Sequence, residues 1–218
     1  MRLYIRHAEK EYNNGHSILL KHDPGLTELG RLQAEETCKL LLKLLGRPHV
    51  IVCSPYKRAR ETAIIMAAII GNDIEIKCDI RLAEYVGNHK DRGLDVDDDT
   101  RSYNPPYPES FYQMDDRVRR HNDDMAELDE SNRIVWFITH GIIVNRLANC
   151  LGYTIHKYPA YLFTMVIEKQ ETLKCSIIQN SVLRPIEKQN NCSRYHRKYD
   201  RIDEAKIPTL KYNKMLYV

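Results

Sequence analysis

Short apolar runs alternate with longer amphipathic segments along most of this chain of 218 residues. The runs predict strands at residues 3–6, 50–53, 74–77, 134–139, 162–168 and 173–179. The segments between them predict helices at residues 27–45, 57–70, 109–128 and 142–151. Helices that alternate with strands cover both faces of a sheet, so this order predicts a three-layer α/β/α domain with a mixed, mainly parallel sheet. The polar connection at residues 169–172 predicts a hairpin, and therefore an antiparallel edge.

Two histidines follow predicted strands. Arg6 and His7 end the first apolar run, and His140 follows the run at residues 134–139. The carboxyl ends of parallel strands meet at one edge of an α/β sheet, which is where such folds bind ligands. A neutral imidazole can attack phosphorus, and a guanidinium binds phosphate oxygens through paired hydrogen bonds. The residues therefore indicate a phosphate site, while the alternative is that each histidine only bonds backbone carbonyls.

The starts of two predicted helices carry further signals. Thr27 is placed to cap the helix at residues 27–45. The apolar face of this helix is expected to consist of four leucines, Leu32, Leu40, Leu41 and Leu44. The helix at residues 57–70 has three cations in its first turns, and a helix start already favours an anion. Arg58 is the predicted phosphate ligand among these cations.

Several motifs together resemble the histidine phosphatase superfamily, in the branch that includes the phosphoglycerate mutases. Arg6-His7-Ala8-Glu9 is similar to the Arg-His-Gly-Glu motif of that family, with alanine in place of glycine. The segment 54–63 fits its Ser-x-x-x-Arg-Ala-x-x-Thr-Ala pattern without departure. Further similar stretches, in the order of the family, are Tyr12-Asn13, residues 23–30, residues 81–84, Pro108-Glu109-Ser110, Thr139-His140-Gly141 and Asn180-Ser181.

The resemblance implies a mechanism. His7 would attack phosphorus and become a phosphohistidine, while Arg6, Arg58 and His140 would hold the phosphoryl oxygens. Glu84 would protonate the leaving oxygen, which predicts a pKa raised toward neutrality. The second ring nitrogen of His7 requires an acceptor, for which a backbone carbonyl is expected. The remaining expected substrate contacts are Lys10, Asn13 and Gly141, and the possible rim contacts are Tyr85 and His89.

The resemblance also implies a phosphoglycerate mutase-like fold and a catalytic domain at residues 1–183. The expected function is a phosphatase that needs no metal or cofactor and hydrolyses phosphate monoesters. Two alternatives stay open: a phosphoglycerate-type phosphomutase, and a regulatory or binding protein that keeps the fold without turnover. Residues 85–107 are shorter than the corresponding mutase insertion and acidic at their centre, which favours hydrolysis and an open site. Such a site could admit a phosphoprotein or a bulky phosphate ester, so the expected substrate is a phosphorylated small molecule or a phosphoprotein.

A metal site is the main chemical competitor, because the chain has nine histidines and an acidic run at residues 95–99. The run lacks the glycine and the distal glutamate of a calcium loop, so a solvated loop is expected there. The six cysteines show no zinc spacing and are expected to be free thiols in a reducing compartment. The chain shows no signal peptide and no membrane-spanning run, which favours a cytoplasmic or nuclear location.

Residues 184–218 differ from the rest of the chain in charge. They hold nine lysines and arginines against four acidic residues, so they account for the positive net charge of +3. Tyrosines interleave with these cations, a pattern that suits nucleic acid or another anionic partner. The alternative is an extension that packs along the domain or stays disordered.

Overall fold

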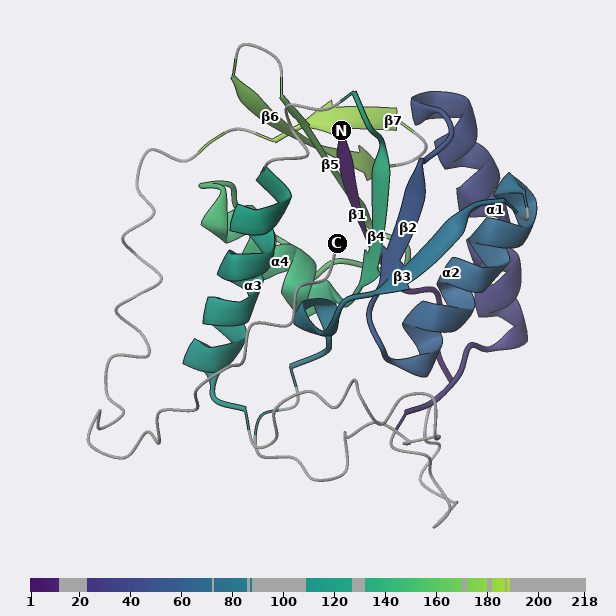
Figure 1. Ribbon diagram of the computed structural model, residues 1–218, viewed down its shortest axis with the longest axis horizontal. Coiled ribbons are helices and arrows are strands. Elements are labelled where there is room, and N and C mark those ends of the chain that lie inside the picture. Colours follow the sequence, from purple (N-terminus) through teal and green to yellow (C-terminus); the bar gives the residue numbers. More distant parts are fainter. Residues whose placement is uncertain are drawn as a thin grey trace.

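The computed structural model describes residues 1–11, 23–71, 73–85, 87, 109–126, 132–169, 172–179, 182–186 and 188. They form one seven-stranded sheet with helices on both faces (Figure 1). The strands are β1 (Arg2–Arg6), β2 (Val50–Cys53), β3 (Glu75–Cys78), β4 (Val135–Thr139), β5 (Thr164–Lys169), β6 (Leu173–Gln179) and β7 (Val182–Pro185). The helices are α1 (Glu28–Leu45), α2 (Lys57–Ile70), α3 (Phe111–Met125) and α4 (Gly141–Cys150), with a 3₁₀ turn η1 (Ile80–Leu82). The predicted three-layer α/β/α architecture is confirmed.

The sheet is mixed, with the strand order β3-β2-β4-β1-β5-β6-β7. Strands β3, β2, β4 and β1 pair in parallel, and β5, β6 and β7 continue the sheet in antiparallel pairings. The hairpin between β5 and β6 is present as predicted. The antiparallel part of the sheet is larger than expected, since it includes β7, a strand that was not predicted from the sequence. This strand is short and ends at Pro185, a residue that sheets tolerate at an edge.

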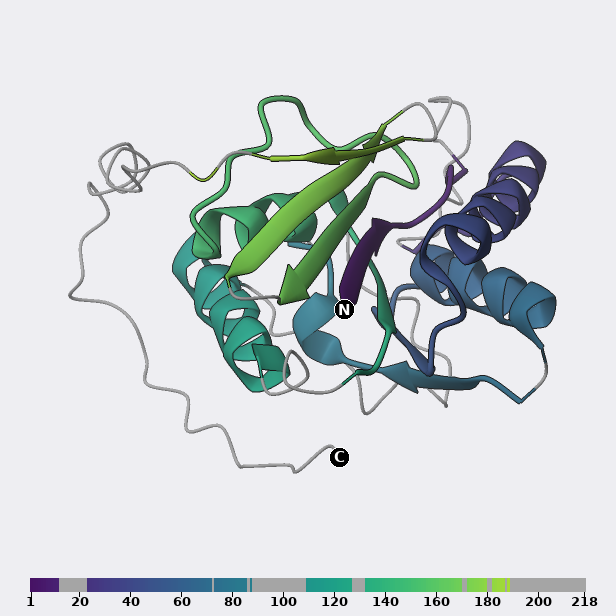
Figure 2. The ribbon, with the colours of Figure 1, turned by 90° about the horizontal axis from the view of Figure 1, so that it is seen from above.

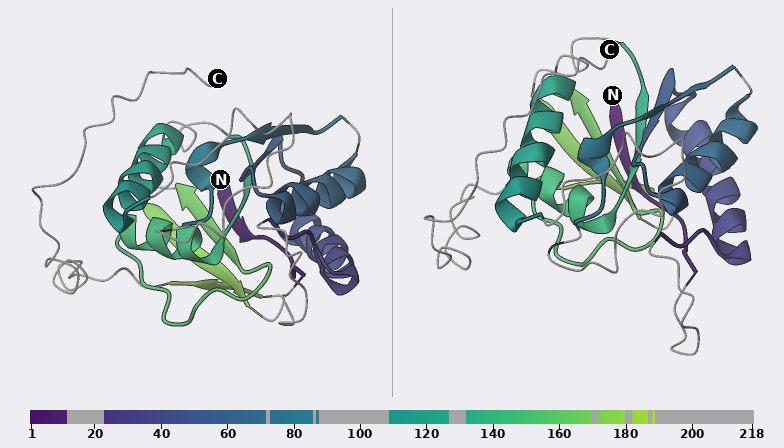
Figure 3. Two further views of the ribbon diagram at one scale, coloured as in Figure 1. Left: turned by 90° about the horizontal axis from the view of Figure 1, so that it is seen from below. Right: turned by 60° about the horizontal axis from the view of Figure 1, so that its bottom comes forward.

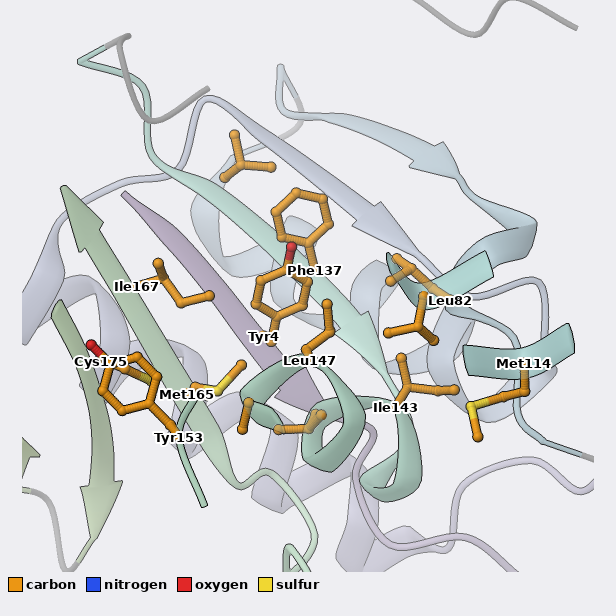
Figure 4. Packing of buried hydrophobic residues seen from close by; sticks show 14 of the residues in the cluster. Tyr4, Leu82, Met114, Phe137, Ile143, Leu147, Tyr153, Met165, Ile167 and Cys175 are labelled. Atoms are coloured by element: carbon orange, nitrogen blue, oxygen red, sulfur yellow. The ribbon is translucent and has the colours of Figure 1, made fainter. Parts of the chain in front are cut away.

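Alternate side chains of the central strands enter two separate cores. Tyr4 and Phe137 stack with ring centroids 4.7 Å apart on the face covered by α3 and α4 (Figure 4). Leu3, Ile5 and Trp136 point to the opposite face, which α1 and α2 cover (Figure 2). The other views show the same separation of the two helix pairs (Figure 3). Burial on both faces explains why these strands are continuous apolar runs.

One prediction about α1 is wrong. Thr27 caps the helix as expected, its side chain accepting from the Gly30 N–H. However, Leu32 and Leu44 are 52% and 41% exposed. Leu41 is buried as predicted, and it completes a buried stripe whose other members are Gly30, Ala34 and Cys38. Small residues let the helix lie close to the chain beneath it: a Cβ atom on Gly30 would lie 2.1 Å from the carbonyl oxygen of Glu9.

The first residues of the predicted C-terminal extension belong to the sheet. Position 184 lies within β7, and Lys188 forms an isolated bridge with Tyr153. The rest of the extension, like the small polar pair at residues 180 and 181, lies outside the described residues. Of the six cysteines, the five in the described part of the chain are free thiols, as predicted. None of the helices that the structure describes has the length and apolar character needed to cross a membrane.

Candidate active site

The parallel pairing of β1 with β4 brings the two strand-end histidines together. Arg6 is in register with Thr139, and the His7 backbone N–H donates to the Thr139 carbonyl at 2.8 Å. The His7 and His140 rings consequently lie 5.2 Å apart at an angle of 63°. The expected convergence at the carboxyl edge of the sheet is present.

His7 is held as a neutral imidazole. Its Nδ1 lies 2.7 Å from the carbonyl oxygen of Ala8, so Nδ1 carries the hydrogen and Nε2 keeps its lone pair. Burial, followed by the neighbouring His140 and Arg58, lowers the pKa of His7 well below its usual value. The acceptor for the second ring nitrogen is thus a backbone carbonyl, as predicted. The Ala8 N–H is itself bonded to the Thr62 hydroxyl at 3.1 Å, which fixes the turn.

Arg58 lies at the centre of the site, in the first turn of α2. Its Nε is 3.3 Å from His7 Nε2, and its Nη2 is 3.3 Å from His140 Nδ1 and 3.4 Å from a Glu84 carboxylate oxygen. Its guanidinium carbon lies 4.5 Å from the ring centre of Tyr56. The four predicted residues His7, Arg58, Glu84 and His140 therefore form one contact cluster.

Asp23 fixes Arg58 from a distant part of the chain. One carboxylate oxygen accepts from Arg58 Nη1 at 3.1 Å, and the other accepts from the backbone N–H of Lys57 at 2.7 Å. Both side chains of this ion pair are almost fully buried. Tyr56, the residue before α2, provides no side-chain cap, so Asp23 supplies one from a segment that the sequence analysis interpreted only as a turn and a family motif.

His140 is bonded on both ring nitrogens. Its Nε2 lies 2.8 Å from the Ser54 hydroxyl, and its Nδ1 lies 3.2 Å from the Glu84 carboxylate. Burial lowers the pKa of His140 to about 4, against the opposing effect of Glu84 and with support from Arg58. Ser54 opens the motif at residues 54–63, but the sequence analysis gave it no role.

The expected pKa of Glu84 is contradicted. Burial alone would favour the neutral acid, but His140 and Arg58 outweigh it and hold the pKa of Glu84 below its ordinary value. Glu84 is thus an ionised carboxylate in this state. The sequence could not show that Arg58 and His140 would both lie within hydrogen-bonding distance of the Glu84 carboxylate.

A buried ion pair supports the segment that carries Glu84. Arg117 of α3 donates to the carbonyl oxygens of Arg81 at 2.7 Å and Glu84 at 3.4 Å. The same guanidinium binds the carboxylate of Glu109, which is 1% exposed. Glu109 belongs to a stretch identified only by family resemblance, and its ion pair with Arg117 supports the backbone at Glu84.

The other predicted contacts are placed less centrally. Arg6 is held by residues 158–161, and its buried Nε has no hydrogen-bond partner within the described residues. The Lys10 backbone pairs with Leu26, and Tyr85 packs edge-on against Phe111, 5.9 Å between ring centroids. Gly141 begins α4, covered by the Tyr158 ring. Asn13 and His89 lie outside the described residues.

One atom each from His7, Glu84 and His140 lies within 4.8 Å of the others, a spacing that could hold a metal ion. The Arg58 guanidinium contacts all three side chains, so a positive charge already occupies this position. Coulomb repulsion from a fixed cation opposes a metal and favours an anion. The geometry suits an anion beside the neutral imidazole of His7.

Comparison with known proteins agrees with this geometry. Residues 3–165 match the model of the histidine phosphatase superfamily (branch 1). The chain belongs to this superfamily. The match spans His7 after β1, the Arg58 helix, Glu84 and His140. The superfamily membership suggested by the motifs is confirmed.

Relatives in the superfamily include phosphatases and a mutase. The chain is 29% identical over 152 residues to "Putative phosphoserine phosphatase 2" of Hydrogenobacter thermophilus, covering 64% of this chain and 73% of the relative. It is 30% identical over 160 residues to "Probable phosphoglycerate mutase GpmB" of Erwinia tasmaniensis, covering 67% and 72%. A solved structure of a mycobacterial glucosyl-3-phosphoglycerate phosphatase complexed with VO3 superposes with a TM-score of 0.57 at 22% identity, covering 80% and 95%. The superfamily fold of the chain is therefore that of phosphoglycerate mutase-like phosphatases.

Proposed function

We propose that this protein is a metal-independent phosphatase that hydrolyses phosphate monoesters through a phosphohistidine on His7. One observation carries the proposal: Nδ1 of His7 is fixed on the Ala8 carbonyl, so the lone pair of Nε2 faces the Arg58 guanidinium. A phosphoryl group bound by that guanidinium would lie within reach of a neutral nucleophile.

The first step transfers the phosphoryl group to the enzyme. His7 Nε2 forms a bond to phosphorus, the ester P–O bond breaks, and the leaving oxygen takes a proton from Glu84. In the second step a water oxygen attacks phosphorus, Glu84 takes the proton of that water, and the N–P bond breaks. Inorganic phosphate leaves, and His7 returns to its neutral form.

Glu84 must gain a proton before it can act as the acid. Its pKa is low because Arg58 and His140 interact with its carboxylate. A bound phosphoryl group brings negative charge to the same two partners, so it weakens their hold on Glu84 and raises its pKa. Substrate binding therefore supplies the shift toward neutrality that the free site lacks.

A phosphomutase is the second candidate, favoured by the similarity to the phosphoglycerate mutase of Erwinia tasmaniensis. A mutase returns the phosphoryl group of His7 to a second hydroxyl group, whereas a phosphatase gives it to water. The names of the phosphatase relatives suggest small phosphorylated metabolites as substrates. A binding protein without turnover is the third candidate. It is disfavoured because all four residues that the proposed reaction needs, His7, Arg58, Glu84 and His140, are present and in contact.

The decisive experiment is release of phosphate from p-nitrophenyl phosphate in EDTA by the wild type, His7→Ala and Glu84→Gln. Wild-type turnover that survives EDTA and disappears with His7→Ala supports the proposal. A folded His7→Ala protein with wild-type activity would overturn it. Strict dependence on a bisphosphorylated primer would instead support the mutase.

A further inference from the structure

The guanidinium of Arg6 is fixed by one loop, between α4 and β5. Its Nη1 donates to the carbonyl oxygen of Pro159 at 2.5 Å. Its central carbon lies 4.3 Å from the ring centre of Tyr161 and 5.1 Å from that of Tyr158. Both distances are within the range of a cation–π interaction. We call Tyr158, Pro159 and Tyr161 the arginine clamp.

The two tyrosines of the arginine clamp also touch the histidine cluster. The Tyr161 and His7 rings lie 5.7 Å apart. The ring of Tyr158 lies so close to Gly141 that a Cβ atom there would be 2.7 Å from its Cζ. The clamp is therefore fixed to the same strand and helix ends that carry His7 and His140.

Fixing Arg6 in advance has a consequence for binding. An unrestrained arginine has a large side-chain entropy, and a ligand that orders it loses affinity accordingly. Here the carbonyl and the two rings already restrict the guanidinium, and they leave its buried Nε without a partner in the described part of the chain. A buried donor without an acceptor is unfavourable until a ligand oxygen reaches it. The arrangement suits an anion that arrives beside His7.

We propose that Tyr158 and Tyr161 are positioning residues, which hold Arg6 ready for a phosphoryl oxygen and thereby set the affinity of the site for phosphate. This inference rests on the proposed function, because the ligand of Arg6 is the phosphoryl group. It also gives a local reason for glycine at position 141, where any side chain would displace Tyr158.

The experiment measures binding of inorganic phosphate to the full chain by calorimetry, together with KM and kcat for p-nitrophenyl phosphate. Tyr158→Leu and Tyr161→Leu remove the rings, and the matched controls Tyr158→Phe and Tyr161→Phe retain them. We expect Tyr161→Leu to weaken phosphate binding by about 3- to 30-fold, as loss of a partly desolvated cation–π contact would. Tyr158→Leu should weaken it less, by about 3- to 5-fold, because Tyr158 is 61% exposed. KM should rise by a larger factor than kcat falls, and each phenylalanine variant should stay within about 3-fold of wild type, since a ring still faces the cation.

A double-mutant cycle with Arg6→Ala separates positioning from general packing. In the Arg6→Ala background, Tyr161→Leu should weaken phosphate binding no further, because the group that it positions is gone. If Tyr161→Leu weakens phosphate binding equally in the wild type and in Arg6→Ala, Tyr161 does not act through Arg6 and the proposal is wrong. If the wild type and the leucine variants bind phosphate equally well, the positioning role of Tyr158 and Tyr161 is wrong, while the proposed function is unaffected. If the folded wild type neither binds phosphate nor hydrolyses the ester, the proposed function itself fails.

Discussion

Arg58 Nε donates to His7 Nε2 at 3.3 Å, so the central cation of the site faces the ring nitrogen that carries no hydrogen. The same guanidinium contacts Asp23, Glu84 and His140. One buried side chain thus connects His7, Glu84 and a remote helix cap.

Asp23→Asn should reduce kcat/KM by about 10- to 100-fold, because Arg58 loses the charged partner that orients it. The amide oxygen can still accept from the Lys57 N–H, so α2 should keep its cap. The matched control is Glu61→Gln, since Glu61 braces the same turn through the Leu26 N–H. Activity of Asp23→Asn equal to that of the control would contradict an orienting role for Asp23.

The pH profile of hydrolysis should have its optimum below pH 7. The lowered pKa of His7 keeps its imidazole neutral at pH values where an ordinary histidine is already protonated. Glu84 ionises readily, so the proton needed by the leaving group becomes scarce as the pH rises. Measurement of kcat/KM, which reports the free protein, between pH 4 and 9 for wild type and Glu84→Gln tests this. A wild-type optimum above pH 8 would exclude Glu84 as the acid.

Arg117→Lys should lower the free energy of unfolding by about 2 to 4 kcal/mol, because the buried Glu109 carboxylate loses its forked partner. It should also lower kcat, since Arg117 supports the Glu84 backbone. Urea unfolding and steady-state kinetics provide the two readings. Arg120→Lys is the control: its exposed pair with Asp116 on the same helix should matter by less than about 0.5 kcal/mol. Equal effects of Arg117→Lys and Arg120→Lys on the free energy of unfolding and on kcat would show that Arg117 does not support the Glu84 backbone.

The protein should become less stable as the pH falls below 6.5. His121 is fully buried, with Nδ1 2.9 Å from the Asp79 carboxylate and Nε2 3.1 Å from the Tyr4 hydroxyl. Burial lowers the pKa of His121, so the unfolded chain takes up the proton first. This contribution is complete above the unfolded pKa and is lost as the pH falls through 6.5 toward the folded pKa.

Urea unfolding at pH 7.5 and pH 5 measures this loss, expected at about 1 kcal/mol or more for wild type. His121→Gln should be less stable at pH 7.5, and its loss between the two pH values should be smaller. The loss should not vanish, because the pKa values of His7 and His140 are lowered too. An unchanged pH dependence in His121→Gln would show that His121 does not contribute to it.

Local sequence patterns determined most of the secondary structure. The apolar runs at β2 and β6 and the amphipathic segment at α2 matched the observed bounds, because strand and helix periodicities are properties of neighbouring residues. The burial of individual leucines was less predictable. Leu32 and Leu44 are exposed because close packing of α1 uses Gly30 and Ala34, a choice that depends on the partner surface.

The sequence by itself therefore determined the α/β class, the strand ends that carry Arg6, His7 and His140, and the helix start that carries Arg58. Only the tertiary structure decided how these groups are held and charged. Asp23 caps a helix from 34 residues away, the arginine clamp holds Arg6 from 153 residues away, and Glu84 is ionised by partners on α2 and after β4. The physical reason is that electrostatic and hydrogen-bond energies depend on distance in space, which the chain sets only when it folds.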